Sequence, residues 1–333
     1  TTASYNIGIG DNALGTNTTA SNNTAIGKNA LAANTTGDLN VAVGTNALDA
    51  NTVGDRNVAV GHNALTTLNP SSNADTCNVA VGYNAGYSMT TGTQNISVGA
   101  YSLDALTTGA DNIAIGTGAL GVATTGNYNI AIGSNALDAT TTASNNVGIG
   151  MNALTANTTG TDNTAVGYQS LDANTTGGSN TAVGHNALTA NTTAGYNTAV
   201  GKNTMTNATT AAGNVAIGYQ AMSSGVQGDY SVAVGQNALY TNTGDSNTAV
   251  GENALFANTS GTNNTAIGRG ALDVNTTGAS NVAIGVGALD ANNANSNTAV
   301  GNSSLGSNTT GNYNVALGQN AAQTNTTGAD IVA

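Results

Sequence analysis

Small aliphatic and polar residues alternate along this chain in a four-residue pattern that recurs throughout its length. Residues 24–27 read Thr-Ala-Ile-Gly and residues 41–44 read Val-Ala-Val-Gly. Nineteen copies occur, and of the eighteen intervals between their closing glycines fifteen are 17 residues, two are 16 and one is 21. A fixed short period is typical of repeat proteins, in which each unit packs only on its neighbours.

Within each copy, β-branched residues flank a small residue. The first position is Ile, Val or Thr in all nineteen copies, the third is Val or Ile in eighteen, and the second is Ala, Gly or Ser. This alternation with a period of two predicts a short β-strand. We expect the β-branched side chains to point into the core and the small residue to point the other way.

A second apolar column follows each glycine in the sequence Gly-x-Asn-Ala-Leu, with Leu in fifteen copies and Met in two. The stretch is predicted to be a second strand or one flat side of a coil. The Asn-Thr-Thr-Gly sequence that follows is typical of a turn. The two columns together give the predicted core, which includes Ile26, Leu31, Val43, Leu48, Val60, Leu65, Val166, Leu171, Val183 and Leu188.

These patterns exclude a helical repeat, because Asn, Thr and Gly are poor helix formers and the aliphatic residues lack helical spacing. They predict an all-β fold: a parallel β-solenoid of about 19 coils with a 17-residue repeat, forming one domain over residues 1–333. Like residues would then stack about 4.8 Å apart. Asn precedes the pattern in eighteen copies, so its stacked amides are expected to donate to one coil and accept from the next.

The irregularities of the repeat gather in one place. The 21-residue interval contains the only proline and the only cysteine, Pro70 and Cys77. Because proline donates no backbone hydrogen bond, residues 69–77 are predicted to bulge from the solenoid. Gly86 then replaces the expected Leu and is followed by Tyr87, so this coil is expected to be repacked locally.

The net charge and the hydropathy of the sequence argue against nucleic acid and membranes as partners. The net charge is −12, with only four Lys and Arg residues, so no basic face for nucleic acid can be built. No stretch approaches the roughly 20 apolar residues of a membrane span. The first residues show no signal-peptide pattern. The chain also begins and ends inside a repeat, from which we expect a segment of a longer fibre.

Each motif with possible chemistry has a simpler structural explanation. Residues 116–121 match a dinucleotide-binding glycine pattern, but that pattern has meaning only in a βαβ unit. His62 and His185 are seven repeats apart and cannot share a metal within one chain. In a trimer each could form a ring of three at its own level if the column faced the axis, but the charged residues of that column favour a solvent-facing position. We predict no catalytic residue, cofactor or metal, and hence no enzyme. Aspartates recur after Leu and are predicted to form a solvated face: Asp49, Asp104, Asp138, Asp172, Asp273 and Asp290.

The residue after each closing glycine varies most and is often charged or aromatic, which predicts exposure to solvent. Exposed tyrosines are useful for contacts with carbohydrate or protein. This position is therefore the candidate surface-contact column, and its predicted contact residues are Lys28, His62, Tyr83, Tyr168, His185, Lys202, Tyr219 and Arg269.

The repeat resembles the head repeats of trimeric autotransporter adhesins and is similar to repeats of phage tail fibres. The resemblance rests on Asn-Val-Ala-Ile-Gly, as at residues 214–218 and 281–285, and it covers essentially the whole chain. It implies a left-handed β-roll that packs as a homotrimer. It also implies attachment to a surface. The coil is longer than is usual in that family because of the Asn-Thr-Thr-Gly extension.

Three functional hypotheses follow. The first is a structural and adhesive fibre rod, extracellular or attached to a cell surface or virion, that contacts copies of itself and a host-surface glycan or protein. It would bind no nucleic acid and insert in no membrane. The second is an ice-binding or other crystal-matching solenoid, because Asn-Thr-Thr recurs in most coils. The third is a subunit of an end-to-end filament, because open solenoid ends expose hydrogen-bonding groups.

Overall fold

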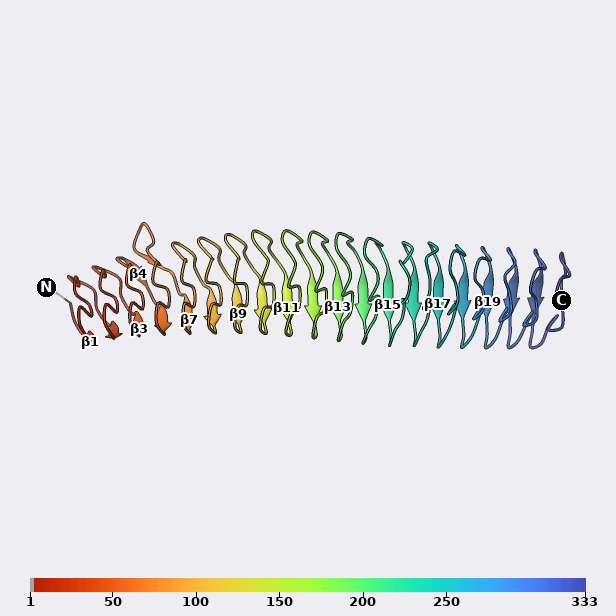
Figure 1. The fold of residues 1–333 in the computed structure, drawn as a ribbon, viewed down its shortest axis with the longest axis horizontal. Coiled ribbons are helices and arrows are strands. Elements are labelled where there is room, and N and C mark those ends of the chain that lie inside the picture. Colours follow the sequence, from red (N-terminus) through yellow and green to blue (C-terminus); the bar gives the residue numbers. More distant parts are fainter. Residues whose placement is uncertain (1–2) are drawn as a thin grey trace. The chain divides into compact units, whose positions relative to one another are not determined.

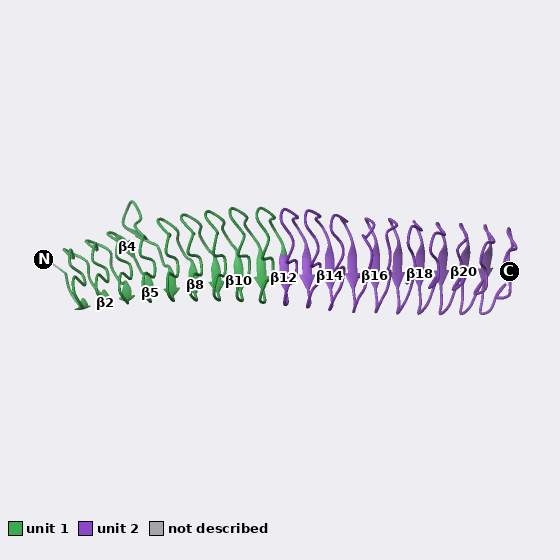
Figure 2. Ribbon diagram, in the orientation of Figure 1, with its two compact units in different colours: residues 1–163 green, residues 164–333 purple. Residues whose placement is uncertain are grey.

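The computed structural model describes residues 3–333 as two compact units, residues 3–163 and residues 164–333 (Figure 2). Residues 1 and 2 of the predicted domain lie outside the described residues. Each unit is an all-β parallel solenoid, and no helix occurs in residues 3–333 (Figure 1). The predicted fold class is confirmed, whereas handedness and the number of associated chains stay predictions.

Nine coils of the first unit each contribute one three-residue strand, and residues 54–75 add two short ones. The strands are β1 (Ile7–Ile9), β2 (Thr24–Ile26), β3 (Val41–Val43), β4 (Gly54–Asp55), β5 (Val58–Val60), β6 (Ala74–Asp75), β7 (Val79–Val81), β8 (Ile96–Val98), β9 (Ile113–Ile115), β10 (Ile130–Ile132) and β11 (Val147–Ile149).

The second unit contains ten coils, again with one three-residue strand in each. The strands are β12 (Thr164–Val166), β13 (Thr181–Val183), β14 (Thr198–Val200), β15 (Val215–Ile217), β16 (Val232–Val234), β17 (Thr248–Val250), β18 (Thr265–Ile267), β19 (Val282–Ile284), β20 (Thr298–Val300) and β21 (Val315–Leu317).

Neighbouring coils pair in parallel and in register, so each column of the repeat becomes a ladder. Between β13 and β14, for example, Thr181 lies opposite Thr198 and Ala182 opposite Ala199. The same register holds for β2 and β3 in the first unit. The repeat length thus sets the stacking, because equal coils place like residues side by side.

The strand side chains point in the opposite directions from those that we predicted. The small middle residue is fully buried, as at Ala25 and Ala182, whereas the flanking β-branched residues are half-buried or exposed. The interior of such a short coil is narrow, and it accepts Ala and turns the larger residues outward. The core prediction was therefore wrong for the strand positions, which are Ile26, Val43, Val60, Val166 and Val183.

The Leu column forms the apolar core, as predicted. Its members Leu31, Leu48, Leu65, Leu171 and Leu188 are all 0% exposed. The surrounding Gly-x-Asn-Ala-Leu stretch consists of successive turns and not of a second strand.

Left-handed backbone closes these turns. In the coil that begins with β13, both Asn186 and Leu188 have positive φ, 55° and 53°. Left-handed φ costs roughly 1–2 kcal/mol for a residue other than glycine. Burial of the Leu side chain gains about 1.5–3 kcal/mol and offsets that cost.

The closing glycines of strands that are followed by another coil are required by close contact between the coils. Gly268 has φ of +132°, and a Cβ atom there would lie 2.5 Å from the carbonyl oxygen of Gly285 in the next coil. Such a contact is far shorter than real Cβ atoms show. The glycine column therefore permits the backbone to turn and the coils to stack.

Buried asparagines join one coil to the next, which confirms the predicted amide ladder. The side-chain oxygen of Asn264 accepts a hydrogen bond from the backbone N–H of Asn281 at 3.0 Å. Its Nδ2 donates to the carbonyl oxygen of Gly278 at 2.8 Å. Asn264 is only 1% exposed. Each such amide thus satisfies backbone groups of the following coil that no strand pairing reaches.

A second buried asparagine column lies in the return turn. Asn275, for instance, donates to the carbonyl oxygen of Gly278 at 3.0 Å. In the first unit this column changes character, because Leu68, Met89 and Leu106 occupy it and are fully buried. Leu65 and Met89 fill the space left by Gly86, whose Cβ position would lie 2.8 Å from the Leu65 Cδ2 atom and 3.7 Å from the Met89 Cε atom. The expected local repacking is therefore present.

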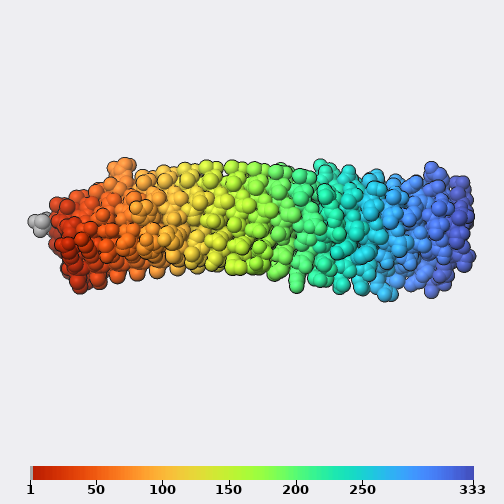
Figure 3. Space-filling model, viewed as in Figure 1, coloured from red at the N-terminus to blue at the C-terminus, as the bar shows by residue number. Residues whose placement is uncertain are grey.

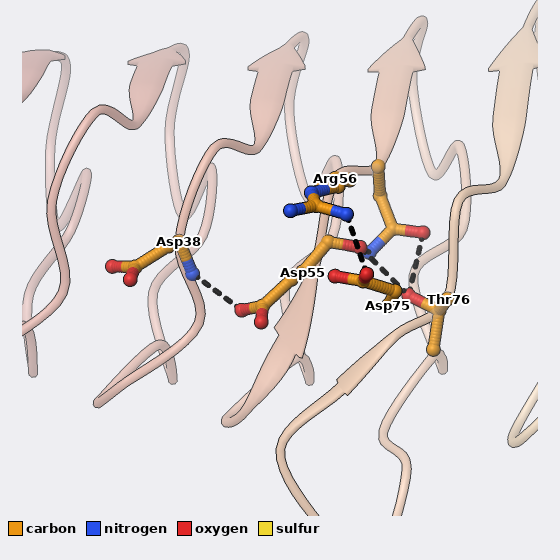
Figure 4. A network of polar contacts seen from close by, with 6 residues as sticks. Asp38, Asp55, Arg56, Asp75 and Thr76 are labelled. Carbon is orange, nitrogen blue, oxygen red and sulfur yellow. Dashed lines mark hydrogen bonds and ion pairs between the residues drawn. The ribbon is translucent and has the colours of Figure 1, made fainter.

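Residues 69–77 bulge from the first unit, as predicted (Figures 1 and 3). Strands β4 and β6 pair in parallel at the base of the bulge, with Gly54 opposite Ala74. Arg56 and Asp75 form an ion pair with an N–O distance of 2.5 Å, and the Thr76 hydroxyl donates to the Asp55 carbonyl oxygen (Figure 4). The insertion is thus held to the coil beneath it.

The reversed sheet faces predict unequal costs for two substitutions in one coil. Leu188→Ala removes a fully buried side chain and should destabilise the second unit by about 2–5 kcal/mol. Val183→Ala removes a half-exposed side chain and should cost about 1 kcal/mol or less. Urea denaturation followed by circular dichroism measures both. Equal costs, or a larger cost at Val183, would show that the strand residues point inward.

The asparagine ladder predicts a graded response at Asn264. Asn264→Ala leaves the buried N–H of Asn281 without its acceptor and should cost about 1–3 kcal/mol. Asn264→Ser should cost less, because Ser231 occupies this column naturally and its hydroxyl accepts from the Asn247 N–H at 3.1 Å. The same denaturation measurement applies. Identical losses for the Ala and Ser variants would argue against the hydrogen bond as the cause.

Candidate functional site

The candidate surface-contact column faces solvent, as predicted. All eight of its proposed contact residues are exposed, from Lys28 to Arg269. Some of them form aromatic pairs between consecutive coils. His62 stacks on Tyr83 with ring centroids 5.4 Å apart, and Tyr168 stacks on His185 at 5.2 Å. Whether the column contacts a partner stays a prediction.

A pocket of about 540 Å³ lies in the first unit, over residues 87–138. Four successive coils line it, and the principal side chains are Tyr87, Tyr101, Asp104, Asn135 and Asp138. Three of these coils depart from the consensus, at Gly86, Tyr101 and Gly118. The pocket therefore arises where the sequence is irregular, and it is not a feature of every coil.

Two glycines form the floor of the pocket. Gly118 stands where the repeat normally has Asn, and its φ of +67° matches the left-handed backbone of that column. Gly121 stands in the column that holds aspartate in the coils on either side. Because both lack side chains, they leave a hollow between the neighbouring coils.

Side chains of the flanking coils point into the space above these glycines. A Cβ atom on Gly118 would lie 2.8 Å from Oδ1 of Asn135. A Cβ atom on Gly121 would lie 2.7 Å from Oδ1 of Asp138 and 3.6 Å from Oδ1 of Asp104. Two carboxylates from coils on opposite sides of the glycine coil therefore approach the same point.

Both carboxyl groups have raised pKa values. Desolvation by burial is the main cause for each. The nearby charge of Asp138 raises the pKa of Asp104 further, although hydrogen bonds from the backbone N–H groups of Asp104 and Ala105 lower it. These two residues were predicted to form a solvated face, and that prediction was wrong for their half-buried carboxyl groups.

Tyr101 and Tyr87 form the aromatic part of the pocket. Tyr101 is 45% exposed and packs edge-on against Tyr83, with ring centroids 5.3 Å apart. Tyr87 is 39% exposed. The Tyr101 ring interrupts a surface ladder of Asn amides that runs through the preceding coils, such as Asn63 to Asn84 at 3.1 Å.

The glycine pattern at residues 116–121 has a structural explanation. It begins with the closing glycine of β9 and continues into the turns of the same coil. No helix follows it, so the βαβ context of a dinucleotide site is missing from the described residues. Its glycines Gly118 and Gly121 nonetheless belong to the pocket.

Several residues of the pocket were not among the predicted contacts. Tyr101 and Asn135 were missed, and Asp104 and Asp138 were placed on the wrong kind of surface. Their signal in the sequence is a departure from the column consensus in two consecutive coils: Tyr for Asn at 101 in one coil, then Gly at 118 and Gly at 121 in the next. Only the structure shows that these departures face one hollow.

The threonine pairs of the return turn are partly engaged within the solenoid. The hydroxyl of Thr35 donates to the carbonyl oxygen of Thr52 at 3.0 Å, and Thr107 donates to Thr124 at 2.9 Å. Ice binding by this column stays a prediction.

Residues 3–333 contain no cluster of three or more His, Cys, Asp or Glu side chains suited to a metal ion. Over the same residues, no helix has the length and apolarity needed to cross a bilayer. Models of known protein families give no match to the sequence, and curated proteins give none either.

The raised pKa values predict that Asp138→Asn stabilises the first unit at neutral pH. When the pKa of a carboxyl group is higher in the folded than in the unfolded state, the free energy of unfolding falls as the pH rises from the lower pKa to the higher one. The variant removes this loss and also the repulsion of Asp104, so its thermal midpoint at pH 7 should exceed that of the parent chain. At pH 3, where both carboxyls are protonated, the difference should vanish.

Asp49→Asn is the matched control, because Asp49 is in the same column and burial raises its pKa as it does that of Asp138, whereas only Asp138 also raises the pKa of Asp104. Its gain at pH 7 should be smaller than that of Asp138→Asn. A lower midpoint for Asp138→Asn at pH 7 would show that the carboxylate is held by favourable contacts.

Proposed function

We propose that this chain is the rod segment of a structural and adhesive fibre, placed outside the cell or on a virion, that associates with copies of itself. Regular hydrogen bonding between coils supports the structural part, because a solenoid bonded along its length resists bending and unfolding. The exposed, variable column after each glycine supports the adhesive part, because it offers side chains of many kinds on a regular scaffold.

The outward face of the parallel sheet carries the proposal. Two columns of β-branched residues run along it, and the core is already filled without them. In the second unit Ile217, Ile267 and Ile284 are 41%, 40% and 37% exposed. An apolar stripe repeated on successive coils is typical of a surface that contacts another protein. A second copy of the same chain offers a matching stripe with the same repeat.

Self-association is therefore expected in dilute solution, with a trimer as the species that the resemblance implies. Ile267→Lys places a charge in the middle of the stripe and should shift the distribution toward monomers, because an unpaired charge is costly to bury. Gln236→Lys adds the same charge at an exposed position after a closing glycine and should leave the distribution unchanged. Sedimentation velocity with circular dichroism separates dissociation from unfolding. A monodisperse parent monomer would contradict self-association.

A further inference from the structure

We propose that the pocket over residues 87–138 binds a neutral pyranose sugar. The proposal rests on the adhesive function above and gives that function a site and a ligand class. It is carried by the geometry of four successive coils: a floor without side chains, aromatic rings at one end and hydrogen-bonding groups on both sides.

The size of the pocket follows from the repeat. The coils on either side of the glycine coil are two strand spacings apart, roughly 10 Å. The coil between these two has Gly118 and Gly121 and therefore no side chains at those positions. The resulting pocket has a volume of about 540 Å³. Small-molecule sites in proteins are typically about 300–1,000 Å³. One or two sugar rings suit this space.

The aromatic rings suit the apolar face of a sugar. Tyr101 and Tyr87 are both partly exposed at the pocket. Tyr101 is supported from behind, because it packs on Tyr83, which in turn stacks on His62. A supported ring loses little conformational entropy when a ligand packs on it, and the tyrosine hydroxyl adds a polar group at its edge.

The polar groups suit several hydroxyls in a small space. Asp104 and Asp138 each direct one carboxylate oxygen to the point above Gly121. Ionised carboxylates only accept hydrogen bonds, and their bonds to O–H donors are short and strong. Asn135 can both accept and donate. A sugar with adjacent hydroxyl groups supplies the donors that the carboxylates need.

Charge favours a neutral ligand over an anionic one. No Lys, Arg or His residue lines the pocket, and two carboxylates do. A phosphate, sulfate or sialic acid group would be repelled there. A neutral hexose, which carries hydroxyl groups and no charge, is compatible with the negative electrostatic potential of the two carboxylates.

The repeat itself supplies a substitution that fills the pocket without disturbing the fold. Gly118→Asn restores the consensus residue of its column, where Asn adopts the same left-handed backbone, as Asn186 does with φ of 55°. The new side chain would occupy the floor. Gly270→Asn is the matched control, because Gly270 is in the same column with φ of +62° and nothing lies within 4 Å of its Cβ position.

The experiment is saturation-transfer NMR on the full chain with methyl glycosides of glucose, galactose, mannose and N-acetylglucosamine, and a methyl sialoside as the anionic probe. At least one neutral glycoside should bind. Gly118→Asn should abolish the signal and Gly270→Asn should keep it. Tyr101→Ala and Asp104→Asn should each weaken binding about tenfold, the change expected for losing one good contact.

Three results would overturn the proposal: no binding of any neutral glycoside to the folded parent chain, equal binding of the sialoside, or unchanged binding by Gly118→Asn. Thermal midpoints of all variants show whether they are folded. Oligomer size is measured separately, so failure of sugar binding does not imply failure of self-association, and a monomeric chain that binds sugar would retain the pocket while contradicting the fibre.

Discussion

The hydrogen bond from one coil to a buried asparagine in the coil before it is the interaction on which this fold depends. A 17-residue coil encloses too little apolar volume to be stable by itself. The backbone groups at its corners are buried and need partners. Asn264 and its counterparts supply those partners at each level, and Ser231 shows that an oxygen acceptor is the minimum requirement. The buried asparagine in each coil therefore fixes both the stacking of the next coil and the backbone conformation where the coil turns.

That constraint also determines which residues are left for function. The interior is occupied by Ala, Leu and the asparagine amides, so the β-branched strand residues and the residue after each glycine are turned outward. The outward stripe can serve association along the length of a unit. Departures from the repeat, as at Tyr101 and Gly118, alter the surface without disturbing the strand register.

Periodicity made much of this structure predictable. The strands, the Leu core, the asparagine ladder and the bulge at residues 69–77 all follow from the spacing of residue types. The direction of the strand side chains was not predictable in the same way, because alternation shows that Val43 and Ala42 face opposite ways but not which face is inside. The width of the coil interior decides that, and it depends on the turns. The pocket depends on three-dimensional neighbours, since Asp104 and Asp138 are 34 residues apart in the sequence and meet only through the coil between them.

We propose that the outer face of the sheet is the contact surface between copies of the chain. Pulsed electron paramagnetic resonance tests it directly, with a spin label at Val250→Cys on that face or at Glu252→Cys in the exposed column, both in a Cys77→Ser background. Sheets packed face to face are about 10 Å apart. Contact between these faces predicts strong dipolar coupling between labels at position 250 of different chains and weaker coupling at position 252. Coupling confined to position 252, or none at position 250, would contradict it.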